Sequence, residues 1–275
     1  MDQNEIKRLE EKAREIRIKT IDVIGNLGVG HIGGCMSVIE VLTLLHYKTM
    51  DTDPKNPNKE VRDKLVLSKG HAGPALYCIL ADRGFFPEDW LYTLNVGGTR
   101  LPSHCDMKRT PGIDMTTGSL GQGLSAAVGL ALGGRINNLD RHVFAVIGDG
   151  ESQEGQNWEA AMTAAHYNLD NLIAFTDYNK MQIDGYTKDI MSLDSIESKW
   201  TGFNWHTLRV DGHDMAAIDD AVERAKAVKG RPSMIILDTI KGKGCSFAEG
   251  VLSNHNMVYS REQADEAIRL LKGEA

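Results

Sequence analysis

The sequence lacks the features of secreted, membrane-spanning and nucleic-acid-binding proteins. Its four cysteines lie far apart and form no C-x-x-C pair, so neither a disulfide framework nor a zinc site is indicated, and reduced thiols are expected. No apolar run approaches the length that spans a bilayer, and the charged segment from Met1 to Arg17 contains no signal-peptide core. The formal net charge of −7 offers no basic surface for nucleic acid or anionic lipid. We therefore expect a cytoplasmic protein that binds neither a membrane nor nucleic acid.

Alternating strand-like and helix-like segments predict an α/β fold, a parallel β-sheet flanked by helices on both faces. The 275 residues could form two small domains or one large one. Because no linker, internal repeat or low-complexity tract divides the chain, we expect a single domain over 1–275. The predicted strands are 65–67, 143–147, 172–176, 206–210 and 234–238; the predicted helices are 4–24, 37–47, 121–134, 157–167 and 215–228, and 93–118 is predicted to be a long loop.

Oxygen-bearing side chains follow two of the predicted strands. Asp149 comes after 143–147, within Gly148-Asp149-Gly150, and Asn179 comes after 172–176. Because the carboxyl ends of parallel strands meet at one edge of a sheet, these side chains should lie close together. Carboxylate and amide oxygens suit Mg²⁺ when phosphate oxygens complete its octahedron. The pattern predicts a site for a cation that holds a diphosphate.

Gly28-Val29-Gly30-His31-Ile32-Gly33 matches the G-x-G-x-x-G pattern of dinucleotide-binding proteins. That pattern needs a strand before it, but residues 6–24 have helical periodicity. It also needs an acidic residue after a second strand, whereas Asp51 and Asp53 lie in a proline-rich loop. The context argues against a nicotinamide cofactor. It favours a glycine-lined loop between two helices that brings His31 close to a ligand.

Four of the nine histidines lie in glycine-rich, strand-end or loop settings and are functional candidates: His31, His71, His104 and His255. The other five have plausible structural explanations. Gly118-Ser119-Leu120-Gly121-Gln122-Gly123 opens the small-residue helix. Its backbone N–H groups would suit a polar ligand at a helix N-terminus, and a tight packing turn is the alternative reading.

Taken together, these motifs resemble the transketolase family of thiamine-diphosphate enzymes, in family order over nearly the whole chain. The matching segments are Gly30-His31-Ile32-Gly33, Leu67-Ser68-Lys69-Gly70-His71-Ala72, His104 in its loop, Thr116-Thr117-Gly118-Ser119-Leu120-Gly121-Gln122-Gly123, Gly148-Asp149-Gly150-Glu151-Ser152-Gln153-Glu154-Gly155, Asp177-Tyr178-Asn179-Lys180, Ile183-Asp184-Gly185, and Lys241-Gly242-Lys243-Gly244 with His255.

The resemblance implies a fold, the thiamine-diphosphate-binding (diphosphate) domain, and a set of roles. Asp149 and Asn179 would bind Mg²⁺ (or Ca²⁺ or Mn²⁺) by their side chains, and Met181 by its carbonyl. His31 and His104 would line the substrate channel and help proton transfer. The cofactor itself would be bound by His71, Gly118, Ser119, Leu120, Gly148, Asp149, Gly150, Glu151, Asn179 and His255, and Glu154 would lie at a contact with a second subunit.

Three positions depart from the family pattern. Ile32 stands where many relatives have proline. His104 lies in Pro102-Ser103-His104-Cys105, with Thr110-Pro111-Gly112 displaced downstream. His255 is followed by Asn256 rather than glycine. The departures bear most on the roles assigned to His104 and His255.

A full-length transketolase is more than twice as long, and its pyrimidine-binding domain supplies the glutamate that activates the cofactor. The resemblance therefore implies a C-terminal partner chain, an α2β2 assembly and sugar phosphate substrates of the pentose phosphate type. A fragment of a longer chain is the alternative. The leading hypothesis is transfer of a two-carbon ketol unit from a ketose phosphate to an aldose phosphate. The others are a related synthase such as deoxyxylulose-phosphate synthase, a split transketolase for a rarer sugar, and a non-catalytic cofactor-binding subunit.

Overall fold

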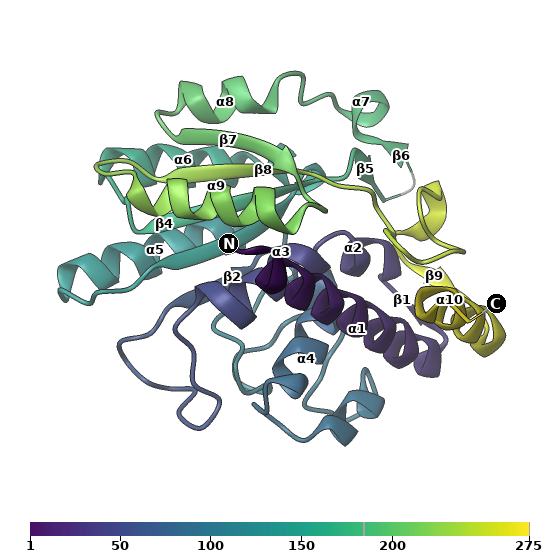
Figure 1. The fold of residues 1–275 in the computed structure, drawn as a ribbon. Coiled ribbons are helices and arrows are strands. Elements are labelled where there is room, and N and C mark those ends of the chain that lie inside the picture. The colour runs from purple at the N-terminus through teal and green to yellow at the C-terminus, as the bar shows by residue number, and fades with distance from the viewer. Residues whose placement is uncertain (184, 275) are drawn as a thin grey trace.

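A five-stranded parallel sheet forms the centre of the molecule (Figure 1). The computed structural model describes residues 1–183 and 185–274, so Asp184 of the Ile183-Asp184-Gly185 motif lies outside the described residues. The predicted parallel α/β fold is confirmed. In order across the sheet, the strands are β2 (Lys64–Leu67), β3 (Val143–Gly148), β4 (Leu172–Tyr178), β8 (Ser233–Asp238) and β7 (His206–Asp211).

Side chains alternate between the two faces of the sheet and enter two separate cores. Phe144 and Val146 pack into the core beneath α1 (Gln3–Leu27), α3 (Ile39–Leu44), α4 (Gly73–Asp82) and α9 (Met215–Ala227). Ala145 and Ile147 pack into the core beneath α5 (Gln122–Ile136), α6 (Gly155–His166) and α8 (Ile196–Gly202). Because both faces are covered, the middle strands are mostly apolar, as parallel strands between helices usually are, and the polar residues of β4 and β8 lie near the strand ends.

The N-terminal helices differ from the sequence prediction at their junctions. The predicted helix 37–47 is divided into α3 and a π-helical turn over Leu45–Thr49, and a separate short helix, α2 (Ile32–Met36), precedes it. Since α2 begins at Ile32, Gly33 and Gly34 are helical rather than part of the predicted loop. The short strand β1 (Val29–Gly30) pairs with β9 (Met257–Val258) outside the main sheet, so the G-x-G-x-x-G segment follows a helix and lacks the dinucleotide-binding context, as expected.

Besides the short α2 and α7, the helices α4, α8 and α10 were not predicted. Helix α4 is buried on all sides and shows no amphipathic period, and α8 is short. Helix α10 (Arg261–Lys272) does carry a sequence signal, because Ser260 and Gln263 form a capping box at its start. The smaller elements are β5 (Met181–Gln182), β6 (Gly185–Tyr186) and α7 (Thr187–Ile190). Residues 94–121 are without regular structure, which agrees with the predicted loop 93–118 except at its ends.

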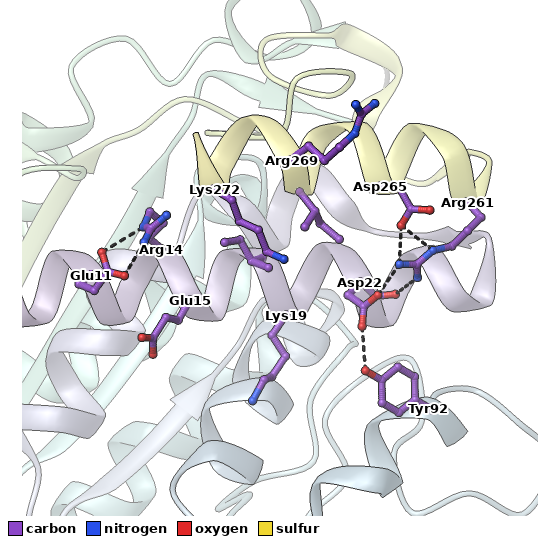
Figure 2. A pocket seen from close by; sticks show the side chains of 12 residues that line it. Glu11, Arg14, Glu15, Lys19, Asp22, Tyr92, Arg261, Asp265, Arg269 and Lys272 are labelled. Atoms are coloured by element: carbon purple, nitrogen blue, oxygen red, sulfur yellow. Dashed lines mark hydrogen bonds and ion pairs between the residues drawn. The ribbon is translucent and has the colours of Figure 1, made fainter. Parts of the chain in front are cut away.

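Helices α1 and α10 lie side by side and leave a groove of about 740 Å³ between them (Figure 2). Arg14 binds Glu11, and Arg261 bridges Asp22 on α1 and Asp265 on α10. These charges compensate one another. Over the part of the chain that the structure describes, no helix has both the length and the hydrophobicity to cross a bilayer.

Helix α5 approaches the end of β2 at a glycine. A Cβ on Gly123 would lie 2.3 Å from Ser68 Oγ and 2.8 Å from Ser68 Cα, so only glycine fits without movement of the chain. Gly129, on the same helix, has nothing within 4 Å of an added Cβ. Glycine in this helix is therefore required at one position and dispensable at the other.

Replacing Gly123 by alanine should lower the free energy of unfolding by about 2 kcal/mol through overpacking. Gly129→Ala is the matched control and should raise it by roughly 0.5–1 kcal/mol, since alanine is the better helix former. Urea denaturation of both variants measures the difference. Equal stabilities for Gly123→Ala and the parent chain would contradict the close approach to Ser68.

Candidate functional site

A cavity of about 220 Å³ opens at the carboxyl ends of the central strands. The segments that follow β3, β4 and β8 meet there, since these strands are neighbours in the sheet. The lining residues are Gly34, Lys69, His71, Leu120, Gly148, Asp149, Gly150, Glu151, Gln153, Glu154, Asn179, Met181, Gln182, Ile183, Lys241 and His255.

Asp149 is the buried carboxylate of this cavity, with 2% of its surface exposed. Its two oxygens accept hydrogen bonds from the N–H groups of Gly150, at 2.7 Å, and of Lys180, at 2.5 Å. Burial raises the pKa of Asp149 to about 7, and the nearby carboxylate of Asp177 adds to the shift. Among the described residues no cationic side chain forms an ion pair with Asp149. A cation in the cavity would relieve this uncompensated charge.

Asn179 and Met181 lie on the other side of the same opening. Asn179 Nδ2 donates to Asp177 at 2.9 Å, and its Oδ1 accepts from the Met181 N–H at 3.1 Å. The chain turns sharply here, because Lys180 has φ 67° and Ile183 has φ 46°, in the left-handed region that such residues rarely adopt. The turn brings an amide oxygen and the Met181 backbone to the cavity beside Asp149.

The donor set fits a hard cation bound together with a ligand. In the described ranges, no group of three or more His, Cys, Asp or Glu side chains is arranged to hold a metal by itself. Asp149, an amide oxygen and a backbone carbonyl would leave most positions of an octahedron to water and to the oxygens of an anionic ligand, as is usual for Mg²⁺.

Glu151 lines the cavity, but both of its oxygens are engaged by protein donors. Oε1 accepts from the Ser68 hydroxyl and from the Gly121 N–H at 2.9 Å, and Oε2 accepts from the Gly148 N–H at 3.0 Å. These bonds join the ends of β2 and β3 to the start of α5. The geometry favours a supporting role for Glu151 behind the cofactor site predicted from the sequence.

The four candidate histidines form one cluster. The His31 ring centroid lies 5.4 Å from that of His71, 5.5 Å from His104 and 5.3 Å from His255, and His71 and His255 are 5.1 Å apart. Burial, followed for His31 by the charge of its neighbours, lowers the pKa of His31 and of His255 to about 4 and that of His71 well below its ordinary value. At neutral pH the cluster is uncharged, so each ring has one nitrogen that donates and one that accepts.

Two lysines complete the cavity, and the sequence prediction did not select either. Lys241, 2% exposed, places Nζ 3.3 Å from His255 Nδ1, and burial followed by the charge of Lys69 lowers its pKa to about 8. Lys69 is paired with Asp177, whereas no ion pair of Lys241 appears among the described residues. Both lysines lie within motifs of the family pattern, Ser68-Lys69-Gly70-His71 and Lys241-Gly242, and this position was the available signal, although the sequence does not show that they are buried.

The Lys69–Asp177 ion pair lies beneath the cavity floor. Asp177 also accepts hydrogen bonds from Ser37, at 2.7 Å, and from Thr239. Burial alone would raise the pKa of Asp177, but Lys69 and these hydrogen bonds hold it below its ordinary value. Lys69 Nζ donates in addition to the Gly34 carbonyl at 3.0 Å. The pair therefore joins the ends of β2, β4 and β8 to α2.

The remaining predicted residues lie at the rim. Leu120 and Glu154 line the cavity and are exposed, while Gly118 and Ser119 lie outside its lining. Gly118 has φ 139°, and a Cβ there would meet the His104 ring at 3.0 Å. The exposed positions of Leu120 and Glu154 suit contacts with the outer part of a ligand or with another chain.

Fold and cavity together define an α/β domain with its ligand crevice at the carboxyl edge of a parallel sheet. A family profile described as "Transketolase, thiamine diphosphate binding domain" matches residues 9–272. The chain therefore belongs to the transketolase family and carries its thiamine-diphosphate-binding domain, which confirms the predicted family.

Two relatives of similar length are named as transketolase subunits. The chain is 57% identical over 97% of its length to 6-deoxy-6-sulfo-D-fructose transketolase subunit SqwG of Clostridium sp. (strain MSTE9), of which it covers 97%. It is 40% identical, again over 97%, to one of the subunits of apulose-4-phosphate transketolase from Actinobacillus succinogenes, of which it covers 96%.

Solved transketolases share the fold. The enzyme from Campylobacter jejuni matches 99% of the chain with a TM-score of 0.92 and 29% identity, and that from Leishmania mexicana matches 97% with a TM-score of 0.89 and 30% identity. The chain spans 43% and 41% of those two proteins.

Removing either partner of the Lys69–Asp177 pair should destabilise the chain by about 3–5 kcal/mol, because the other charge is left buried and unpaired. The double variant Lys69→Met/Asp177→Asn should recover part of the loss. Denaturant unfolding of the two single variants and the double variant measures the coupling. As a control, Arg209→Met breaks the exposed contact with Asp238 and should cost no more than about 1 kcal/mol. Additive losses in the double variant would show that the pair is not coupled.

Proposed function

We propose that the chain is the diphosphate-binding subunit of a two-chain transketolase, and that it binds thiamine diphosphate with Mg²⁺ in the sheet-edge cavity. The observation that carries the proposal is that the buried Asp149 and the buried Lys241 line the same cavity, and that neither has an ion-pair partner among the described residues. The Asp149 carboxylate is stabilised by a cation, and the Lys241 ammonium is stabilised by an anion. A diphosphate bound together with a metal ion supplies both charges.

Each cavity residue then has a distinct part. Asp149 and Asn179 hold the metal by their side-chain oxygens and Met181 by its carbonyl, while Gly150 lets the diphosphate approach the backbone. Lys241, His71 and His255 face the diphosphate oxygens. When bound, the cofactor supplies the chemistry of carbon–carbon bond cleavage; the protein binds, orients and excludes water.

His31 and His104 belong to the histidine cluster but not to the cavity lining, and they are proposed to bind the hydroxyls of a sugar. Their neutral rings can donate one hydrogen bond and accept another, and they can pass a proton without becoming a fixed charge. The lowered pKa of each ring favours the accepting form at neutral pH. This suits a substrate that gains and loses hydroxyl protons during ketol transfer.

A second chain is proposed to cover the cavity, supply the pyrimidine-binding domain with its activating glutamate, and form an α2β2 assembly. Support comes from the two relatives named as subunits, which the chain matches over nearly their full lengths. The exposed apolar side chains of Leu120 and Ile183 line the cavity together with Glu154, and Ile240 is exposed next to Lys241 in the sequence; they offer a surface for such a contact. The exposed fractions of the three range from 37% to 62%.

The donor is proposed to be a ketose with an anionic group at the end remote from the carbonyl. The pentose phosphates are the general case in the family, but the 57% identical relative is named for a sulfonated ketose and the 40% identical relative for a phosphorylated branched sugar. The names favour the sulfonated ketose. Phosphate and sulfonate present the same tetrahedral oxygen geometry with different charge.

Asp149→Asn should abolish the joint effect of Mg²⁺ and thiamine diphosphate on stability. At a concentration 100 times the dissociation constant, the ligand pair should stabilise the parent chain by about 2.7 kcal/mol, visible as a rise in melting temperature. Without ligands the two proteins should differ in free energy of unfolding by no more than about 1–2 kcal/mol, because the removal of a buried charge offsets the loss of one accepted hydrogen bond to an amide nitrogen that only donates. A ligand-induced shift of equal size in both proteins would refute the metal site.

Lys241→Met should weaken thiamine diphosphate binding about 10- to 100-fold, since a buried charge-assisted contact is worth roughly 1.5–3 kcal/mol. The matched control is Lys243→Met, two residues away, whose ammonium lies 3.7 Å from Glu249 at the surface. Isothermal titration at fixed Mg²⁺ compares the three proteins. Equal losses in both variants would point to a general charge effect.

Mixing the chain with the product of the neighbouring reading frame should yield ketol transfer to an aldose phosphate acceptor. The sulfonated ketose should be the better donor and the corresponding ketose phosphate the weaker one, judged by kcat/KM. Consumption of pyruvate instead would favour a deoxyxylulose-phosphate synthase. Binding of the cofactor with no turnover of any ketose would favour a non-catalytic subunit.

A further inference from the structure

The buried residues Arg17 and Glu40 and the partly buried His213 form a polar chain outside the cavity lining. Arg17 Nη2 donates to Glu40 Oε1 at 2.7 Å, and His213 Nδ1 lies 3.1 Å from Glu40 Oε2. Burial alone would raise the pKa of Glu40, but Arg17 and His213 hold it below its ordinary value. Glu40 is therefore ionised at neutral pH, with a partner on each oxygen.

Both ends of this polar chain hold one segment, residues 240–244. The Ile240 N–H donates to His213 Nε2 at 2.9 Å, and Arg17 Nε donates to the Lys243 carbonyl at 2.8 Å. Because a backbone N–H can only donate, Nε2 must accept, and Nδ1 carries the proton that is donated to Glu40. The two neighbours thus select one tautomer of His213.

Residues 240–244 pack closely against the neighbouring backbone and against Arg17. Gly242 (φ 84°) donates to the Gly33 carbonyl at 3.0 Å, and a Cβ on it would lie 2.3 Å from the Ala248 carbonyl oxygen. Gly244 (φ 77°) passes so close to Arg17 that a Cβ would lie 2.6 Å from Arg17 Cδ. The backbone on either side of Lys241 is therefore held in one position.

We propose that Arg17, Glu40 and His213 are positioning residues, which hold the 240–244 segment so that Lys241 presents its ammonium to the anion in the sheet-edge cavity. The proposal deepens the proposed function and rests on it for the identity of that anion. None of the three lines the cavity, so they act through the segment. Their bonds to its backbone on both sides of Lys241 distinguish this arrangement from ordinary packing.

The first test replaces single members of the polar chain in the full-length protein, alone and assembled with its partner subunit. His213→Gln and Glu40→Gln should each weaken thiamine diphosphate binding at fixed Mg²⁺ about 10-fold, the lower end of the effect of removing outer-shell partners from a site. His206→Gln, on β7 and bonded to neither Glu40 nor Ile240, is the control and should bind as the parent does. Parent-like affinity in both network variants would overturn the proposal.

The second test asks whether the effect passes through Lys241. In a Lys241→Met background, His213→Gln should cause no further loss of cofactor affinity, because the group that it positions is gone. An undiminished 10-fold loss there would overturn the proposal and indicate a general effect on stability. Melting temperatures of all variants establish that binding is measured on folded protein.

The third test needs no cofactor and separates this inference from the proposed function. After reductive methylation with ¹³C, the Lys241 resonance, assigned through Lys241→Arg, reports the pKa of that amine. His213→Gln should move its titration upward by about 1 unit or more, toward the value for a solvated lysine, because the released segment admits water. An unchanged titration would overturn the inference. Failure of the parent chain to bind thiamine diphosphate would refute the proposed function. The titration of Lys241 would still test the positioning role of His213, because it is measured without the cofactor.

Discussion

The buried ion pair between Lys69 and Asp177 is the interaction on which the arrangement of the site depends. It connects the ends of β2 and β4 directly and reaches β8 and α2 through Thr239, Ser37 and the Gly34 carbonyl. Burying two charges is costly, so such a pair contributes more to specificity of position than to net stability. Here it fixes where the backbone leaves β2, β4 and β8. Asn179 and Lys241 follow β4 and β8, and Asp149 follows β3, which lies between β2 and β4 in the sheet.

Much of this arrangement could be predicted from the sequence, because it follows from local pattern. The apolar strands, the parallel sheet and the meeting of Asp149 with Asn179 all derive from strand-and-helix alternation and from the rule that parallel strands end at a common edge. The four histidines were selected by their settings, and the structure brings them into one cluster. The transketolase resemblance then named the ligand that such an edge would hold.

What could not be predicted depends on contacts between distant segments. Helix α4 is apolar on every side and shows no period, so its type is decided only by the core around it. Lys69 and Lys241 could not be singled out, because nothing local distinguishes a buried lysine from an exposed one such as Lys243. His213 was expected to have a structural role, which its bonds to Glu40 and Ile240 bear out, but its link to the Lys241 segment is visible only in three dimensions.

The close approaches of Gly123 to Ser68, Gly34 to His71 and Gly33 to Asn254 have a consequence for how this scaffold can diverge. An added methyl carbon would lie 2.3 Å from Ser68, 2.9 Å from His71 and 2.4 Å from Asn254, so at each place one of the two neighbours would have to move. We therefore expect proteins with this fold to change their sugar specificity through substitutions in the irregular segment 94–121 and in the surface offered to a second chain. In a protein adapted to an unusual substrate, the loops and the partner chain would then differ in sequence, while the residues of the sheet-edge cavity would stay almost the same.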